Sequence, residues 1–255
     1  MNEFTNIPQT IASIIQDKAY RADDIGRSES AVFVFDDMVL KIEKTSAVSD
    51  NEYEIMKWLD GKLPTPRVIA FERQNGYNYL LMTKLSGKMA CDQTLGLENI
   101  VKGLAAGLKM LWSLDIKDCP KQFTAADKLR EAKKRMENSK NKNCEALYTY
   151  LETHLPEDDL VFSHGDYCLP NVFLEGETPV GFLDLGQAGV ADRWQDIYWC
   201  VWSMRYNLCE FFGMSGEEYE RRQTLLFEEL GMDYDEEKIR WYQTLEDLWE
   251  ASEKT

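Results

Sequence analysis

Hydrophobic residues in the first third of the chain occur in short runs typical of β-strands. The predicted strands are 31–35 (AVFVF), 38–43 (MVLKIE) and 78–85 (NYLLMTKL). The pair Asp36-Asp37 between the first two runs is typical of a hairpin turn. Residues 51–59 instead show helical spacing and end before Asp60-Gly61, a plausible helix end. The pattern predicts a small, strand-rich N-terminal part.

From about residue 89 the pattern changes to that of amphipathic helices. The predicted helices are 97–114, 124–137, 143–154, 197–210, 217–230 and 236–249. Thr124 and Asp127 have the spacing of a capping box at the start of the second helix. A short hinge at 83–88 would join the two parts. We therefore expect an α+β chain with a β-rich lobe over 1–88 and a helical lobe over 89–255.

The charge of the chain limits the classes of partner. The formal net charge is −16, which argues against nucleic acid as a partner because phosphate binding requires basic patches. The excess of acidic over basic residues is concentrated toward the C-terminal end, since residues 205–255 contain 14 acids and 6 bases. A concentrated acidic surface attracts cationic ligands. The alternative explanation, that exposed acids only keep the helices soluble, stays open from composition alone.

Composition also predicts the compartment. No apolar stretch approaches the roughly 20 residues that a membrane span needs, and the first twenty residues lack the pattern of a signal peptide. We therefore expect a cytoplasmic protein that is not bound to a membrane. The six cysteines form no CxxC pair, and the chain has two histidines, so we expect reduced, packed thiols rather than a zinc site.

The strongest chemical signal comes from two segments, LVFSHGDYCLPN at 160–171 and GFLDLGQAG at 181–189. Apolar, strand-like runs lead to Asp166, followed five residues later by Asn171, and then to Asp184. Asn171 and Asp184 offer the hard oxygen ligands that Mg²⁺ prefers, while Asp166 can face a substrate hydroxyl. These segments have the HxDxxxxN and Asp-Leu-Gly patterns of the catalytic and metal-binding loops of kinases.

Two further residues near these loops have alternative explanations. His164 could act as a general base, but we favour a buried histidine that orients the loop by hydrogen bonding, because Asp166 is better placed for the substrate. Asp196 follows the metal-binding segment. We expect it to hold the catalytic loop rather than to touch a ligand.

Lys41 and Glu52 extend the kinase pattern into the N-terminal part. Lys41 lies within a predicted strand, where a lysine can also be explained by the solubility of a sheet edge. Glu52 lies on the following predicted helix. Either residue alone is weak evidence, but the order Lys, Glu, HGD and DLG favours a kinase in which the lysine binds ATP phosphates and pairs with the glutamate. The Gly/Ser segment Gly26–Ser30 precedes the first strand and by itself indicates a turn.

The chain resembles the aminoglycoside O-phosphotransferases, most closely the 3′-type that modifies kanamycin and neomycin. The selective segments are WLDGKLPTPRV (58–68), YLLMTKLSG (79–87), SLDIKDCP (113–120), LVFSHGDYCLPN (160–171), GFLDLGQAGVADRWQDI (181–197) and IRWYQTLEDLW (239–249). The resemblance implies a protein-kinase-like two-lobed fold that uses ATP or GTP with two Mg²⁺ ions. It also implies a cationic aminoglycoside as the acceptor.

The resemblance also implies roles for individual residues. Lys41, held by Glu52, would bind phosphates; Ser28 and Ser30 would cover them; Thr83 and Leu85 would offer backbone groups to the purine; Asp166 would be catalytic; and Asn171 and Asp184 would bind Mg²⁺. Glu246 and Asp247 match acidic positions that bind substrate ammonium groups. Composition alone would leave these two as solvated helix acids.

Several positions depart from the family pattern. Val39 replaces an aromatic residue that commonly stacks on the purine, and Trp202 and Tyr206 replace polar or charged residues of some relatives. The tail 250–255 extends beyond the position where relatives tend to end. These changes keep a second acceptor class open, another small hydroxylated amine or sugar. A non-catalytic nucleotide- or drug-binding protein is a third hypothesis.

Overall fold

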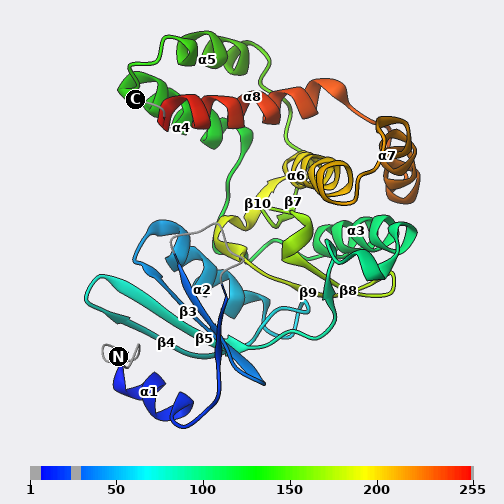
Figure 1. The fold of residues 1–255 in the computed structure, drawn as a ribbon. Coiled ribbons are helices and arrows are strands. Elements are labelled where there is room, and N and C mark those ends of the chain that lie inside the picture. Colours follow the sequence, from blue (N-terminus) through cyan, green and yellow to red (C-terminus); the bar gives the residue numbers. More distant parts are fainter. Residues whose placement is uncertain (1–6, 24–29, 254–255) are drawn as a thin grey trace.

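The computed structural model describes residues 7–23 and 30–253 of the chain. Its N-terminal part is a five-stranded antiparallel sheet in the order β1-β2-β3-β5-β4, with two helices (Figure 1). The elements are α1 (Gln9–Ile15), β1 (Arg21–Asp23), β2 (Ala31–Val34), β3 (Met38–Lys44), α2 (Ala47–Leu59), β4 (Val68–Gln74) and β5 (Tyr77–Thr83). The three predicted strands and the hairpin at Asp36-Asp37 are confirmed.

Alternation along β5 gives the sheet two apolar faces. Tyr79 and Leu81 belong to the hydrophobic cluster that includes Ile11 of α1. Leu80 and Met82 point the opposite way and pack in the cluster that includes Ile55 of α2. This follows from the two-residue period of a strand. The two helices therefore cover opposite faces, and α2 lies on the face toward the rest of the molecule.

Helix α2 begins four residues earlier than the sequence predicted. Ser46 caps it by accepting a hydrogen bond from the Ser49 amide (3.1 Å), and the Ser49 hydroxyl accepts one from the Ser46 amide (2.9 Å). This is a capping box in which serine replaces the usual Glu or Gln. Strand β4 was not predicted. It follows the Leu63–Pro66 segment and pairs only with β5 among the described strands, as an edge strand.

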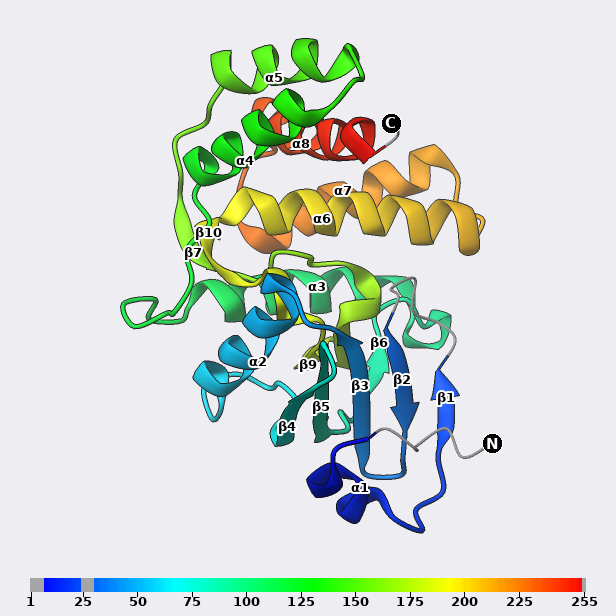
Figure 2. The same ribbon diagram turned by 90° about the vertical axis from the view of Figure 1, so that its left-hand side faces the viewer.

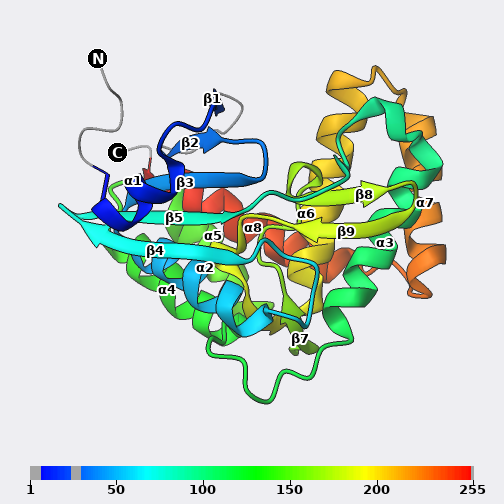
Figure 3. The ribbon, with the colours of Figure 1, turned by 90° about the horizontal axis from the view of Figure 1, so that it is seen from below.

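The second part of the chain is mainly helical and contains two small antiparallel sheets, β6-β8-β9 and β7-β10. Its elements are β6 (Lys88–Met89), η1 (Gln93–Leu95), α3 (Leu97–Trp112), α4 (Ala125–Asn138), α5 (Asn143–Thr153), β7 (Leu160–Ser163), η2 (Leu169–Asn171), β8 (Val172–Glu175), β9 (Thr178–Phe182), η3 (Leu185–Gln187), β10 (Gly189–Asp192), α6 (Arg193–Arg205), η4 (Tyr206–Phe211), α7 (Gly216–Leu230) and α8 (Glu236–Glu253). Helix α3 packs along the β8–β9 hairpin (Figure 3), and α6 runs between α8 and the sheets (Figure 2).

Two helix boundaries differ from the predictions. Helix α6 begins at Arg193, earlier than expected, because Asp192 precedes it as a cap; after Arg205 the chain continues as the π-helical turn η4. Helix α8 continues beyond residue 249. Its extension contacts α4 through Arg135, whose Nη1 lies 3.5 Å from Glu253 Oε1, and the segment after α4, where Asn141 Nδ2 donates to the Ala251 carbonyl (3.0 Å). The tail is therefore ordered helix up to Glu253.

One hydrophobic core runs from α2 and β5 through α3 to α6 and α8. The two predicted lobes thus share apolar packing, and their boundary at residue 88 stays a prediction. All six cysteines are unpaired, as expected. Within the described ranges, no helix has the length and apolar character needed to cross a membrane.

The close approach of α3 to the catalytic segment gives a test of the packing. A Cβ at Gly107 would fall on the Tyr167 hydroxyl, which donates to the Leu104 carbonyl (2.8 Å). We expect Gly107→Ala to lower the free energy of unfolding by about 1–3 kcal/mol through overpacking, despite a helix-propensity gain of up to about 1 kcal/mol. Urea unfolding measures the change.

Gly216→Ala is the matched control, because Gly216 lies in the first turn of α7 and an added Cβ there meets nothing within 4 Å. This variant should be neutral or slightly more stable than the parent protein. Equal stability of Gly107→Ala and the parent would contradict the packing described for α3.

Candidate active site

A cavity of about 360 Å³ lies between the sheet and the β8–β9 side of the second part. Its wall includes the predicted nucleotide and metal residues except Ser28, which lies outside the described residues: Ser30, Lys41, Glu52, Thr83, Leu85, Asn171 and Asp184. Apolar side chains from both parts complete the wall, among them Val39, Met82 and Phe173. The fold therefore gathers residues from both parts of the chain around one space.

Lys41 of β3 is the centre of an ion network at the polar end of this cavity. Its Nζ lies 2.7 Å from Glu52 Oε2, 3.2 Å from Asp184 Oδ1 and 3.5 Å from Glu43 Oε1. The pairing with Glu52 expected from the sequence is present. Burial by itself would lower the pKa of Lys41, but the surrounding carboxylates outweigh it and raise the pKa above its usual value. Lys41 is therefore a permanent positive charge.

Glu52 of α2 is buried, and burial destabilises the ionised form of its carboxyl group. Burial raises the pKa of the Glu52 carboxyl, and the ammonium of Lys41 opposes the rise. A carboxylate in such a place is stable only while its partner is present. Lys41 and Glu52 thus hold each other in position.

Asp196 of α6 holds the loop that carries Asp166. Its side chain is fully buried. Oδ1 accepts from the Ser163 hydroxyl (2.8 Å) and the Gly165 amide (2.9 Å), and Oδ2 accepts from the His164 amide (2.9 Å). The expectation that Asp196 holds the catalytic loop is confirmed.

His164 is buried, as predicted, but its ring does not make the expected hydrogen bond. Neither ring nitrogen has a hydrogen-bonding partner among the described residues. The ring instead packs edge-on against Tyr167 and Phe182, with centroids 5.9 and 6.4 Å away. The loop is oriented by the His164 backbone amide and by ring packing, and the sequence pattern could not separate these from a ring hydrogen bond.

The loop that carries Asp166 packs on the segment that begins at Asp184, and each of these segments contains a residue with positive φ. Gly165 has φ of +83°, and a Cβ there would overlap the backbone carbonyl of Gln187. Asp184 is left-handed, with φ and ψ both 58°. Such a conformation in a residue other than glycine is uncommon and is often found at functional sites. Asn51 of α2 secures the segment after Asp184: its Nδ2 donates to the carbonyls of Gly186 (3.0 Å) and Ala188 (2.9 Å).

Asn171 connects the predicted catalytic and metal-binding residues. Its side-chain Nδ2 donates to Asp166 Oδ2 and to the backbone carbonyl of Asp166, both at 3.0 Å. The backbone carbonyl of Asn171 accepts from the Leu183 amide (2.9 Å). Because the amide nitrogen is engaged, Oδ1 is the Asn171 atom able to bind a cation. Asp184 supplies a carboxylate from the neighbouring segment.

This donor set fits Mg²⁺ that enters with a nucleotide. The described part of the chain contains no group of three or more His, Cys, Asp or Glu able to enclose a metal. Mg²⁺ is usually held by one or two carboxylates together with substrate phosphates. Asn171 and Asp184 supply such a partial set, so the chemistry of the donors agrees with the predicted metal, whose ligands stay a prediction.

The end of β5 and the segment that follows it form another part of the cavity wall. The Thr83 amide donates to the Arg67 carbonyl (2.9 Å), and the Thr83 hydroxyl accepts from the Arg67 amide (2.9 Å). Of the polar groups of Thr83, the backbone carbonyl is therefore the candidate for purine binding. The backbone of Leu85 stays a second candidate. Phe173 was not predicted. It follows Asn171 by two residues in β8, and strand alternation after Asn171 could have identified it.

The predicted acceptor residues lie on α8. Glu246 is half-buried and Asp247 is exposed. Gln243 Nε2 donates to Asp247 Oδ1 (2.9 Å), and Gln243 Oε1 accepts from the Tyr198 hydroxyl of α6 (3.4 Å). Burial raises the pKa of Glu246 to about 7; Lys128 opposes the rise, and Asp166 adds to it. Glu246 therefore interacts electrostatically with the catalytic loop, and Lys128 is a nearby cation that the sequence did not indicate.

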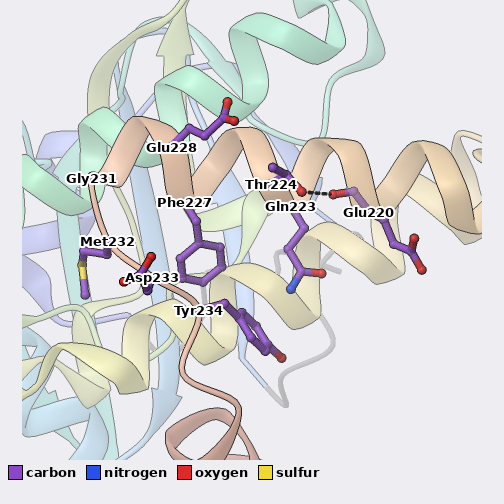
Figure 4. Close-up of a pocket in the computed structure, with 9 residues that line it drawn as sticks. All are labelled: Glu220, Gln223, Thr224, Phe227, Glu228, Gly231, Met232, Asp233 and Tyr234. Carbon is purple, nitrogen blue, oxygen red and sulfur yellow. Dashed lines mark hydrogen bonds between the residues drawn. The ribbon is translucent and has the colours of Figure 1, made fainter.

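Another cavity, of about 610 Å³, lies between α7 and the segment leading into α8 (Figure 4). Glu220, Glu228 and Asp233 are on its wall, together with Phe227 and Tyr234. None of the predicted catalytic, nucleotide or metal residues lines it. This cavity is therefore separate from the one around Lys41.

The fold, the loop that carries Asp166 and the segment that carries Asp184 are those of a kinase-like phosphotransferase. A sequence model of the phosphotransferase enzyme family matches residues 20–248, and the chain belongs to that family. Its relatives include aminoglycoside 3′-phosphotransferases. That of Niallia circulans is 38% identical over 212 residues, and that of Enterococcus faecalis is 35% identical over 216 residues; each match covers 78% of both chains.

Solved structures show the same fold. Aminoglycoside phosphotransferase APH(3″)-Id from Streptomyces rimosus has a TM-score of 0.78 at 21% identity, over 93% of this chain and 95% of the other. A second structure of that enzyme, in complex with ADP and streptomycin, has a TM-score of 0.77 at 20% identity over the same shares. The predicted protein-kinase-like fold and the resemblance to aminoglycoside phosphotransferases are confirmed.

The three hydrogen bonds to Asp196 give a test of loop positioning. Asp196→Asn would place an amide NH₂ against a backbone N–H or the Ser163 hydroxyl. We expect unfolding free energy to fall by about 1–3 kcal/mol. We also expect kcat to fall about 100-fold, because small displacements of reacting groups have effects of that size. Denaturation and steady-state phosphotransfer measure the two quantities.

Asp115→Asn is the control. Asp115 is exposed, and its Oδ1 accepts from the Lys117 amide (3.0 Å), a bond that asparagine can keep. Both quantities should match those of the parent protein. A kcat within threefold of the parent for Asp196→Asn would show that Asp166 does not depend on this anchor.

Proposed function

We propose that this protein transfers the γ-phosphate of ATP to a hydroxyl group, expected to be the 3′-hydroxyl, of an aminoglycoside. One observation carries the proposal: a single cavity combines the Lys41–Glu52 ion pair with Asn171 and Asp184. Asn171 also donates a hydrogen bond to Asp166. The relatives named aminoglycoside 3′-phosphotransferases support the acceptor class. The complex of the Streptomyces rimosus enzyme with ADP and streptomycin supports the nucleotide and the kind of drug. The cytoplasm, where ATP is available, stays the predicted location.

On the nucleotide side, we assign Lys41 to the α and β phosphates. Its ammonium stays charged near neutral pH because three carboxylates surround it. The purine would lie between Val39 and Met82 of the sheet and Phe173 of β8, with the Thr83 carbonyl and Leu85 at its polar edge. Mg²⁺ held by Asn171 and Asp184 would neutralise charge on the phosphate oxygens.

On the acceptor side, we assign Asp166 to the attacking hydroxyl. Asn171 occupies Asp166 Oδ2, so Oδ1 is the atom we propose to orient the hydroxyl and accept its proton. Phosphoryl transfer needs in-line positioning and charge neutralisation more than covalent help. Glu246 and Asp247 would bind ammonium groups and so present one hydroxyl of a polycation to Asp166.

The second acceptor class, another small hydroxylated amine or sugar, stays the alternative hypothesis. Product NMR after reaction with kanamycin, and with a relative of it that lacks the 3′-hydroxyl, decides the acceptor and the position. Absence of turnover with kanamycin, neomycin and every other aminoglycoside tested would exclude the first class. Turnover of an amino sugar alone would establish the second.

Substitution of Asp166 tests the catalytic assignment. For Asp166→Ala we expect kcat to fall by about 10²–10⁴-fold, the usual contribution of a general base, with nucleotide affinity changed only a few-fold. ADP release with kanamycin and calorimetric nucleotide titration measure these effects. The control is Asp233→Ala, an exposed acid in the cavity of Figure 4. Activity of Asp166→Ala within a few-fold of the parent would favour the non-catalytic binding hypothesis.

Glu246 makes acceptor binding depend on pH. Burial raises its pKa to about 7; Lys128 and Arg135 oppose this rise, and Asp166 and Glu250 add to it. Because an ammonium group pairs with the ionised form, acceptor affinity should increase about tenfold from pH 6 to pH 8. The acceptor KM measured across this range should therefore fall with rising pH.

Glu246→Gln separates this effect from titration of the acceptor itself, which is common to both proteins. The variant should bind the acceptor weakly at pH 8 and lose the part of the pH dependence assigned to Glu246. Identical pH profiles for the parent and Glu246→Gln would show that this carboxylate does not bind the acceptor.

A further inference from the structure

Helix α6 carries a row of aromatic side chains that continues into the π-helical turn η4. The rings of Trp199 and Trp202 meet edge-on at 5.7 Å, and those of Trp202 and Tyr206 are stacked at 5.5 Å with an interplanar angle of 6°. Phe211 meets Tyr206 edge-on at 5.3 Å. Trp202 is 39% exposed and Phe211 61% exposed. Trp and Tyr are enriched at interfaces, and contiguous exposed apolar patches often mark binding sites.

The row begins beside the catalytic loop. Gln195, Trp199, Trp202 and Tyr206 are spaced by three or four residues and so share one face of α6. Gln195 Nε2 donates to the Gly165 carbonyl (3.0 Å), directly before Asp166. The aromatic row therefore leads away from the residue that we assign to the attacking hydroxyl.

The two flanks of the row are also known. On one side, the Ser203 hydroxyl accepts from the Leu169 amide (3.0 Å), which places the catalytic segment there. On the other side, Tyr198 reaches Gln243 of α8, which holds Asp247. The aromatic face thus lies between the catalytic loop and the acidic end of α8, where the acceptor must bind.

A cavity of about 540 Å³ extends from this face toward α7. Trp202 and Tyr206 form part of its wall, and Glu210 and Glu220 add negative charge. Arg205 is also in the wall, but its guanidinium lies over the Tyr219 ring, 5.9 Å from the centroid. The cavity therefore combines exposed π faces with carboxylates, which is the chemistry that attracts an organic cation.

We propose that Trp202, stacked on Tyr206, is an aromatic platform for an ammonium-bearing sugar ring of the acceptor, which occupies this cavity while another ring presents its hydroxyl to Asp166. The proposal rests on the proposed function and specifies how the same site selects its substrate. The negative face of an indole attracts cations, and an ammonium group over it has the favourable geometry of a cation–π contact. The acids on both flanks supply the charge complementarity.

This arrangement selects acceptors of a particular shape. The substrate must be a polyamine with at least two rings, long enough to reach from Asp166 to Trp202. Part of its affinity comes from π contact and stacking rather than from ion pairs, so that part is less sensitive to salt than carboxylate binding. A single-ring amino sugar would not gain from Trp202.

The test compares Trp202→Leu and Trp202→Phe with the parent protein. Leucine keeps an apolar side chain but has no π face, so the kanamycin KM should rise about 2- to 30-fold, with the ATP KM unchanged and kcat altered less than KM. Phenylalanine should restore most of the affinity. Tyr77→Leu, at an exposed aromatic residue on β5, is the control and should change neither KM. A kanamycin KM for Trp202→Leu within twofold of the parent would overturn the platform.

Equilibrium binding keeps this test separate from the proposed function. Kanamycin is titrated into parent, Trp202→Phe and Trp202→Leu proteins, followed by calorimetry without nucleotide turnover. If kanamycin binds without being phosphorylated, and binds Trp202→Leu more weakly than Trp202→Phe, the platform stands and the transferase assignment fails. If kanamycin is phosphorylated but binds all three proteins equally, the platform fails and the transferase assignment stands. Absence of kanamycin binding to the parent overturns the platform, and it overturns the transferase assignment as well when neomycin and the other aminoglycosides are not phosphorylated either.

Discussion

The site depends on one buried carboxylate. Asp196 has no exposed surface and satisfies both oxygens with Ser163 and the amides of His164 and Gly165. These bonds set the direction in which the chain leaves β7, and so the position of Asp166. Gly165 then lets this loop pack on the Gln187 carbonyl, in the segment that follows Asp184. A charge that would be costly if unpaired in the interior thus becomes the anchor for two loops.

Much of this arrangement could be predicted from the sequence because the chemistry is encoded in local order. The HGDxxxxN and DLG segments are contiguous, so Asp166, Asn171 and Asp184 were identified by spacing. Lys41 and Glu52 were found because a strand and a helix with clear periodicity carry them. The roles of these residues stay predictions, but their pairing is geometric and is observed. The three strands β2, β3 and β5 and most helices were predicted for the same reason, since their apolar patterns are regular.

The remaining features depend on contacts between distant segments, which a single sequence does not display. Asn51 resembles any helix surface residue until its bonds to Gly186 and Ala188 are seen. Lys128 resembles a solvated lysine, although it lies near Glu246. The π-helical turn η4 after Arg205 was predicted as ordinary helix, because its residues carry no distinctive local signal. The role proposed for the aromatic row on α6 depends on the catalytic segment and α8 lying on its two sides, and the sequence does not show these neighbours.

The bond between Asn51 and the segment after Asp184 has a consequence for control of the protein. In kinases that are switched on and off, the helix that carries the glutamate partner of the lysine changes position. Here any swing of α2 would leave the Asn51 amide and two carbonyls of the other part without partners, at a cost of about 1–3 kcal/mol for each buried group. The Asn51 hydrogen bonds therefore stabilise the position of α2 in which Lys41 and Glu52 are paired.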